Sequence, residues 1–320
     1  MILLVTGGAG FIGSNFIRFM INSRPDCEII NLDLLTYAGN INNVADVANN
    51  SRYTFIHGDI CNKKTVNSIF SRYAVDAVVN FAAESHVDRS IIDPSAFVRT
   101  NILGTHTLLE SARATQVKKF IHISTDEVYG SKEEGSFQET DPLAPSNPYA
   151  ASKAGADLIA FSYFNTFQTP VIITRCTNNF GPFQHPEKVI PFFVTNLIDG
   201  KNVPVHGTGN NVRDWIHVSD HCRAIGCLLD HGTPGEIYNI SAGNEKTTLE
   251  ITRELLDYLS LDDSRIEYVA DRPANDQRYS VDCSKLMQLG WKPRSSFHEM
   301  LHETIEWYIR NERWWRPLTR

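Results

Sequence analysis

The sequence lacks long apolar runs, and no segment approaches the ~18 residues that a membrane-spanning helix requires. It also lacks a basic excess, because 30 Lys and Arg stand against 37 Asp and Glu, a formal net charge of −7. Nucleic-acid-binding surfaces are normally built on basic excess. We therefore expect neither a membrane nor a nucleic acid as partner, while a local basic pocket for a small anionic molecule stays open.

Cysteine is sparse, and its six positions form no C-x-x-C pair and no zinc-finger spacing with histidine. The scattered cysteines and histidines lead us to expect reduced, buried thiols and no bound metal. The first residues, Met1–Val5, run directly into a glycine turn without the basic and apolar regions of a secretion signal. Together these features predict a cytoplasmic location.

What the sequence does contain is enough apolar residues, 42% of 320, for a large core and about two domains. Up to residue 175, short β-rich runs alternate with segments of helical periodicity, which predicts a doubly wound α/β fold around a parallel sheet. The expected strands are Ile2–Thr6, Glu28–Leu32, Tyr53–His57, Ala77–Phe81, Lys119–Ser124 and Val171–Arg175. The expected helices are Ile12–Ile21, Lys63–Tyr73, Phe97–Ala114 and Ala150–Phe167.

From residue 176 onward this alternation breaks, and turn-rich segments separate shorter elements. We expect residues 1–175 to form the dinucleotide-binding domain with the catalytic residues, and residues 176–320 to form mainly a smaller lobe. Two later segments, Val203–Val205 and Gly235–Ile240, are candidates to return to the main sheet.

Three glycines follow the first expected strand and open the first expected helix: Gly7, Gly10 and Gly13. Small residues are needed where the backbone turns tightly, approaches a pyrophosphate and packs helix against strand. The pattern alone is weak evidence, because tight turns also use glycine. Its position between strand and helix favours a Rossmann-type dinucleotide site.

An acidic residue, Asp33, ends the second expected strand 20 residues after Gly13. At that place a carboxylate accepts the ribose hydroxyls of adenosine and repels a 2′-phosphate, so NAD is favoured over NADP. At the end of the third strand, Asp59 and Ile60 are candidate adenine contacts.

A phenol and an ammonium, Tyr149 and Lys153, stand four residues apart and hence on one face of a helix. We expect Lys153 to lower the pKa of Tyr149, so that its phenolate can act as a base near neutral pH. With Ser124 and Thr125 at the end of an earlier strand, the pair predicts a hydride-transfer site.

The chain resembles the extended short-chain dehydrogenase/reductase family over almost its whole length. Within that family it is similar to the nucleotide-sugar 4,6-dehydratases, above all those that act on dTDP-glucose. The resemblance is carried, in order, by Thr6–Ser14, Leu35–Asn40, Phe81–Ser90, Ser124–Gly130, Tyr149–Lys153, Thr174–Pro182 and Val212–Trp215. It implies a Rossmann fold, NAD as cofactor, a nucleotide-sugar substrate and a homodimer formed through a four-helix contact of Phe97–Ala114 and Ala150–Phe167.

The adjacent carboxyls Asp126 and Glu127 are the most informative pair, because related epimerases and decarboxylases are not expected to carry both. Elimination of water across C5 and C6 needs a base for the C5 proton and an acid for the C6 hydroxyl. The resemblance implies that Glu127 is that base and Asp126 that acid. It also implies that Tyr149, with Lys153 and Thr125, takes the C4 hydroxyl proton.

The resemblance further implies two sets of binding residues. Those for NAD are Gly7, Gly10, Phe11, Ile12, Gly13, Asp33, Thr36, Asp59, Ile60, Ala82, Ala83, Thr100, Tyr149, Lys153 and Asn178. Those for the sugar nucleotide are Glu84 and Ser85 near the sugar, and Asn179, Glu187, Lys188, Arg213, Arg272 and Asn275 around the diphosphate. Arginine offers a planar fork that binds phosphate oxygens bidentately.

One departure leaves the nucleotide base open. Where bacterial dTDP-glucose enzymes typically carry histidine, this chain has Asn275, as in plant and viral UDP-glucose 4,6-dehydratases. Asn178–Pro182 and Thr36–Asn40 look like the dTDP enzymes, so dTDP-glucose is favoured and UDP-glucose or another hexose nucleotide is the alternative. A nucleotide-sugar 4-epimerase or decarboxylase, and a non-catalytic dinucleotide sensor, are the further alternatives.

Overall fold

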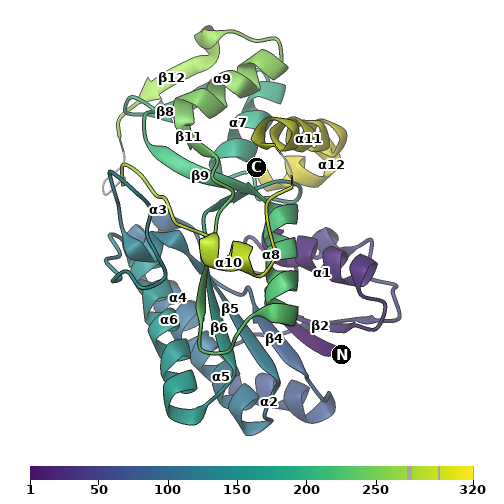
Figure 1. Ribbon diagram of the computed structural model, residues 1–320. Coiled ribbons are helices and arrows are strands. Elements are labelled where there is room, and N and C mark those ends of the chain that lie inside the picture. Colours follow the sequence, from purple (N-terminus) through teal and green to yellow (C-terminus); the bar gives the residue numbers. More distant parts are fainter. Residues whose placement is uncertain (272–275, 295, 320) are drawn as a thin grey trace.

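The larger lobe is built around a seven-stranded sheet whose strand pairs are all parallel, in the order β10-β6-β5-β4-β1-β2-β3 (Figure 1). The computed structural model describes residues 1–271, 276–294 and 296–319. The strands are β1 (Ile2–Thr6), β2 (Glu28–Asp33), β3 (Tyr53–His57), β4 (Ala77–Asn80), β5 (Lys119–Thr125), β6 (Val171–Cys176) and β10 (Ile237–Ile240). The chain reverses its direction of travel across the sheet between β1 and β4, which is where ligands bind in such folds.

Helices cover both faces of this sheet, so the predicted doubly wound fold is confirmed (Figure 1). Helices α1 (Phe11–Ser23), α8 (Val218–His231) and α10 (Ser284–Gln288) pack on one face. Helices α2 (Lys63–Arg72), α5 (Thr105–Ala114) and α6 (Pro148–Phe167) pack on the other. Each buried Ile, Leu or Phe side chain in these layers contributes roughly 1.5–3 kcal/mol relative to exposure.

The segment before α5 departs from a regular helix. It runs through α3 (Val87–Ile92) and α4 (Ser95–Phe97) into η2 (Val98–Gly104), which is a π-helix. The wider turn places Asn101 so that its side chain accepts from the Glu84 N–H at 2.9 Å and donates to Ser152 Oγ at 2.8 Å. π-helical turns are frequent at functional sites, and this one ties the loop after β4 to α6.

The smaller lobe contains two short sheets and a helical layer (Figure 1). Its strands are β7 (Asn178–Phe180), β8 (Val203–His206), β9 (Val212–His217), β11 (Glu245–Thr247) and β12 (Ile266–Val269). Its helices are α7 (Val189–Ile198), α9 (Thr248–Tyr258), α11 (Phe297–Arg310) and α12 (Glu312–Trp315). Short 3-10 turns complete the chain: η1 (Ile41–Val44), η3 (Asp126–Tyr129), η4 (Asp263–Arg265) and η5 (Arg316–Thr319).

The chain crosses between the lobes more than once. Strand β10 returns to the edge of the main sheet beside β6, whereas β8, the other candidate for return, pairs with β12 in the smaller lobe. Within the described residues, no helix has both the length and the apolar composition needed to cross a bilayer.

Candidate active site

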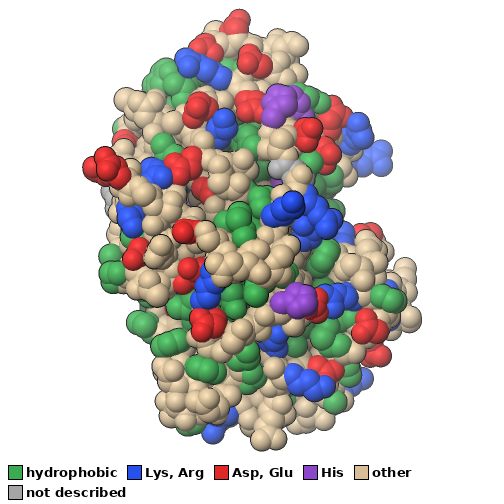
Figure 2. Space-filling model, viewed as in Figure 1, with side chains coloured by type: hydrophobic (Ala, Val, Ile, Leu, Met, Phe, Trp, Pro, Cys, Tyr) green, Lys and Arg blue, Asp and Glu red, His purple; other side chains and the backbone are tan. Residues whose placement is uncertain are grey.

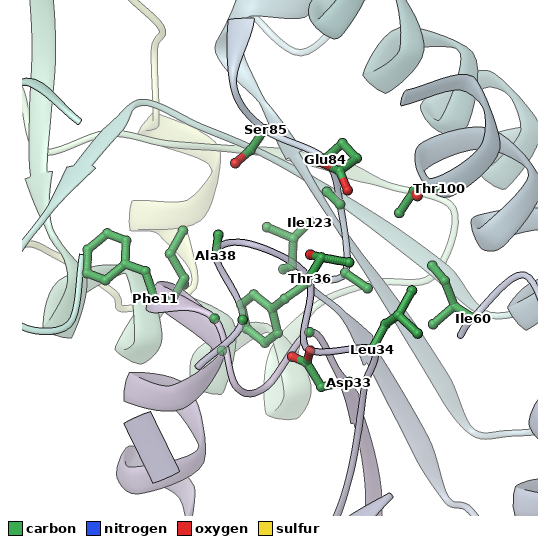
Figure 3. Close-up of a pocket in the computed structure, with 18 of the residues that line it drawn as sticks. Phe11, Asp33, Leu34, Thr36, Ala38, Ile60, Glu84, Ser85, Thr100 and Ile123 are labelled. Carbon is green, nitrogen blue, oxygen red and sulfur yellow. The ribbon is translucent and has the colours of Figure 1, made fainter. Parts of the chain in front are cut away.

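A pocket opens at the carboxyl ends of the central strands (Figure 3). Four residues from the side of the smaller lobe complete it: Gln184, His185, Glu187 and Lys188. Many of the residues predicted from the sequence line it. For the cofactor these are Gly7, Gly10, Phe11, Ile12, Gly13, Asp33, Thr36, Asp59, Ile60, Ala82, Ala83, Thr100, Tyr149 and Lys153, and for the substrate they are Glu84, Ser85, Glu187 and Lys188.

Two of the three predicted glycines in the turn, Gly7 and Gly13, leave no room for a side chain. Gly7 has φ +67°, and a Cβ on it would lie 2.7 Å from the Ala82 nitrogen. A Cβ on Gly13 would collide with the Gly7 carbonyl oxygen. The first residues of α1, Phe11–Gly13, line the pocket, and no acidic residue in that turn offsets the positive end of the helix. The cradle therefore fits the pyrophosphate of a dinucleotide.

Asp33 anchors the turn and faces the pocket at the same time. Its Oδ2 accepts from the Ala9 N–H at 2.8 Å and its Oδ1 from the Leu35 N–H at 2.7 Å. Burial raises the pKa of Asp33, and these two hydrogen bonds oppose the shift. Each carboxylate oxygen accepts two hydrogen bonds, so the side chain retains capacity for the two ribose hydroxyls of NAD.

The pocket has two chemically different ends (Figure 3). Asp33, Leu34 and Ile60 lie at one end, while Glu84 and Ser85 lie at the other. Beside Ile60, the Asp59 carboxylate receives hydrogen bonds from the Arg99 guanidinium at 2.5 Å and the Cys61 N–H at 2.7 Å. Burial alone would raise the pKa of Asp59, but these hydrogen bonds lower it. The first end suits an adenosine and the second a sugar.

Lys153 and Tyr149 stand on the first turns of α6, which Asn147 caps by accepting from the Ala150 N–H at 2.9 Å. Lys153 is 3% exposed, and its ammonium donates to the Ile123 carbonyl at 2.6 Å. Burial lowers the pKa of Lys153 to about 8, against the opposing effect of Asp157. The helix is thus fixed to the end of β5.

The sequence predicted that Lys153 lowers the pKa of Tyr149, but the two strongest influences on that pKa in the structure act in the opposite direction. Burial raises the pKa of Tyr149 well above its ordinary value, and the neighbouring Glu127 carboxylate raises it further. A hydrogen bond with Thr125 opposes the shift. The phenol therefore needs a further positive charge to ionise near neutral pH.

Asp126 and Glu127 occupy different environments in the turn η3, directly after β5. The Asp126 carboxyl is 3% exposed, and burial, followed by Glu127 and Asp214, raises its pKa well above its usual range. Burial also raises the pKa of Glu127, but Arg213, Lys188 and a 3.5 Å hydrogen bond from Asn147 oppose that shift. The two carboxyls are therefore divided into a better acid donor and a better base.

Thr125 contacts both residues, through the side chain of Asp126 and the backbone of Glu127. Its hydroxyl donates to Asp126 Oδ1 at 3.2 Å and accepts from the Glu127 N–H at 3.3 Å. Thr125, Asp126 and Glu127 do not themselves line the pocket in the described part of the chain, but Ser124, which precedes them, does.

Some of the predicted substrate residues line the pocket and others do not. The Lys188 ammonium donates to the Ser85 carbonyl at 2.9 Å, and Glu187 lies 3.4 Å from Arg89. Arg213 stacks its guanidinium 4.2 Å from the ring centre of Tyr279, outside the pocket lining.

Four further predicted binding residues are not among those that line this pocket in the described part of the chain. Asn178 and Asn179, on β7, are not among the lining residues of the described chain, and Asn179 Oδ1 instead lies 2.9 Å from His221 Nδ1. Arg272 and Asn275 lie outside the described residues. The four assignments stay predictions.

Several lining residues were not predicted from the sequence: Leu32, Leu34, Ala38, Gly39, Gly58, Phe81, Ile123, Gln184 and His185. Most of them lie next to motifs that were recognised in the sequence, so the segments that carry them were already predicted to contribute to the site. Gln184 and His185 gave no such signal, because the Tyr308 hydroxyl on α11 holds the Gln184 carbonyl from 124 positions away.

Comparison with known proteins accounts for this combination of residues. Residues 4–304 match the model of a family described as GDP-mannose 4,6 dehydratase. A dTDP-glucose 4,6-dehydratase of Streptomyces niveus is 49% identical, over 99% of this chain and 96% of the relative.

Two solved structures resemble the chain at different levels of sequence identity. DesIV, a dTDP-glucose 4,6-dehydratase of Streptomyces venezuelae crystallised with NAD, is 52% identical with a TM-score of 0.96, over 99% of this chain and 100% of that one. A UDP-glucose 4-epimerase of Thermus thermophilus, also solved with NAD, is 29% identical with a TM-score of 0.90, over 97% and 100% of the two chains. The chain belongs to the GDP-mannose 4,6 dehydratase family, within the extended short-chain dehydrogenases/reductases.

Proposed function

We propose that the chain is a dTDP-glucose 4,6-dehydratase, which converts dTDP-glucose to dTDP-4-keto-6-deoxyglucose and water. The observation that carries the proposal is the pair of adjacent carboxyls at the end of β5, Asp126 and Glu127, beside Tyr149. Oxidation at C4 alone would not need them. The 49% identity to the Streptomyces niveus dTDP-glucose 4,6-dehydratase, over nearly all of both chains, supports the same reading.

The residues that would hold NAD are the glycine turn, Asp33 and the first turn of α1. Bound there, the cofactor supplies a hydride acceptor for C4 and a hydride donor for C6, and a positively charged ring. That positive charge is of the sign that the buried Tyr149 phenol requires for ionisation.

Tyr149 takes the proton of the C4 hydroxyl, and the Thr125 hydroxyl hydrogen-bonds to the phenol. Lys153 holds α6 against β5 through the Ile123 carbonyl, so that the phenol keeps its position relative to the end of the strand. The C4 ketone formed in this step makes the neighbouring C5 proton acidic.

Glu127 removes the C5 proton and Asp126 protonates the departing C6 hydroxyl. Burial raises the pKa of both carboxyls, but Arg213 and Lys188 oppose the rise for Glu127, whereas two neighbouring carboxylates add to it for Asp126; this difference supports the assignment of Glu127 as base and Asp126 as acid. A protonated carboxyl can donate to a leaving hydroxyl, and an ionised one can accept a proton from carbon.

The test of the substrate is incubation of the NAD-loaded protein with dTDP-glucose and, separately, with UDP-glucose, followed by mass spectrometry. We expect loss of one water from dTDP-glucose at a higher kcat/KM. Equal or better turnover of UDP-glucose would assign UDP-glucose, the alternative, as the substrate. An epimerase, the reaction of the 29% identical neighbour from Thermus thermophilus, would change neither mass.

The proposed partner is a second copy of the chain. Exposed apolar side chains gather on α3, η2 and α6, which pack together: Ile91, Ile92, Val98, Leu103, Leu158, Phe161 and Phe167. Ile92 is 84% exposed and Leu158 63%. Exposed apolar side chains that gather on packed helices mark interaction sites, and a symmetric dimer would cover them with the same helices of the partner.

The cytoplasm is the proposed location. All six cysteines carry free thiols, which is the state that a reducing compartment maintains.

A further inference from the structure

A cluster of metal-binding side chains lies on the surface of the smaller lobe, away from the pocket. It consists of Glu254 on α9 and of His298 and His302 on α11, whose potential ligand atoms all lie within 4.8 Å of one another. In Figure 2, histidine side chains lie beside acidic ones on the surface over α9 and α11. The expectation that the chain holds no metal overlooked the four-residue spacing of this histidine pair.

The two imidazoles are presented by regular helix geometry. Residues four apart share one helix face, and the His298 and His302 ring centres lie 3.9 Å apart. Both stand in an H-E-x-x-H segment, an arrangement by which helices offer two imidazoles to zinc. The backbone thus fixes two of the donors before any ion binds.

The third donor comes from the neighbouring helix. Glu254 Oε1 lies 2.7 Å from His298 Nδ1, and the Glu254 side chain is only 19% exposed. Two donors around one tetrahedral zinc ion are about 3.3 Å apart, given bond lengths of about 2.0–2.2 Å. Small side-chain rotations are therefore enough to bring all three donors around an ion.

Neighbouring side chains and helices hold the three donors in fixed positions relative to one another. Leu255 and Leu301, each next to a donor, are fully buried in the core of the lobe. One turn further along, the ring of Tyr258 on α9 lies 4.4 Å from that of His302, and its hydroxyl donates to Glu306 at 2.6 Å. Helices α9 and α11 both pack on α7, which fixes the spacing between the side chains that the two helices present to each other.

We propose that Glu254, His298 and His302 form a binding site for a divalent transition-metal ion of the zinc type, which fastens α9 to α11. Two imidazoles and one carboxylate suit zinc and leave its fourth position to water. The donor set disfavours magnesium and calcium, which prefer oxygen ligands. His298 is 66% exposed, so an ion can reach the site from solvent.

The test measures zinc binding to the NAD-loaded, chelator-treated protein by equilibrium dialysis against zinc chloride. We expect one ion per chain, and a loss of affinity of at least about tenfold in each of His298→Ala and His302→Ala. The matched control His231→Ala removes an exposed histidine at the end of α8 and should bind as the wild type does. Magnesium in excess should not displace the zinc.

A second readout is thermal stability. Zinc should raise the Tm of the wild type and of His231→Ala, and should leave His298→Ala unchanged, because a ligand stabilises only a fold that binds it. Glu254→Gln, which retains the shape of the side chain, gives the same comparison without loss of packing. Equal zinc binding by the wild type and the double variant His298→Ala/His302→Ala would overturn the proposal.

Discussion

The ammonium of Lys153 donates a 2.6 Å hydrogen bond to the backbone carbonyl of Ile123. This one contact joins α6, which carries Tyr149, to the strand whose end carries Asp126 and Glu127. A buried link between helix and sheet therefore helps to position the base for the C4 hydroxyl relative to the two groups for elimination.

Replacement of Lys153 by Met should change how stability depends on pH. The folded-state pKa of about 8 lies below the ordinary 10.5, so the unfolded chain holds this proton more tightly. The free energy of unfolding of the wild type therefore gains a contribution that rises between about pH 8 and 10.5, by about 3 kcal/mol at 1.36 kcal/mol per pKa unit. Chemical denaturation across this range measures it.

In Lys153→Met this rise should be absent, and the wild type and variant curves should converge as the pH increases. Lys118→Met is the matched control, because Lys118 is 80% exposed. It should keep the wild-type pH dependence. Parallel pH curves for the wild type and Lys153→Met would contradict the burial of a charged ammonium beneath the site.

Glu127→Gln should block removal of the C5 proton. We expect water loss to fall by about 10²–10⁴-fold, the usual contribution of a general base. In deuterated water, nuclear magnetic resonance should show no solvent deuterium at C5 of the recovered sugar nucleotide.

Asp126→Asn should behave differently, because it removes the acid and leaves the base. Deuterium exchange at C5 should persist while water loss falls. If Glu127→Gln exchanged deuterium at C5 as fast as the wild type, the two roles would be assigned wrongly.

Asp33→Asn should weaken NAD binding. The amide keeps the shape of the side chain but has a single acceptor oxygen, whereas the Ala9 and Leu35 N–H groups each use one oxygen of the carboxylate. A hydrogen bond to a charged group contributes about 1.5–3 kcal/mol, so we expect affinity to fall about 10- to 100-fold by calorimetry. Asp46→Asn, at a position 55% exposed, should bind NAD normally, and unchanged affinity in Asp33→Asn would exclude the role.

Leu158→Asp should disrupt the proposed dimer, because it places a charge in the exposed apolar face of α6. Light scattering should give the mass of two chains for the wild type and of one for the variant. Met287→Asp, at an exposed position on α10, is the control and should remain dimeric. A wild-type mass of one chain would contradict the proposal.

The parts of the fold and site that follow local rules could be predicted from the sequence. Strands β1 and β3 match their predicted ranges residue for residue, because both are short apolar runs bounded by turns. Gly7 and Gly13 were found through their spacing, and the structure shows that each excludes a side chain. The four-residue spacing of Tyr149 and Lys153 placed both on α6.

The remainder depends on contacts between distant segments. Local spacing could not show that Lys153 bonds to the Ile123 carbonyl or that burial raises the pKa of Tyr149. The placement of Gln184 depends on Tyr308, from a helix near the end of the chain. The π-helical turn at Val98–Gly104 was not predicted from the sequence either, because its residues have ordinary helical periodicity.

The most direct test of the account follows a deuterium label placed at C4 of dTDP-glucose. The proposed reaction moves hydrogen from C4 to C6 of the same sugar, so nuclear magnetic resonance and mass spectrometry of the 4-keto-6-deoxy product should find the deuterium in the C6 methyl group. Deuterium that returns to C4 without water loss would identify an epimerase, and deuterium lost to solvent would exclude internal hydride return; either result would contradict the account.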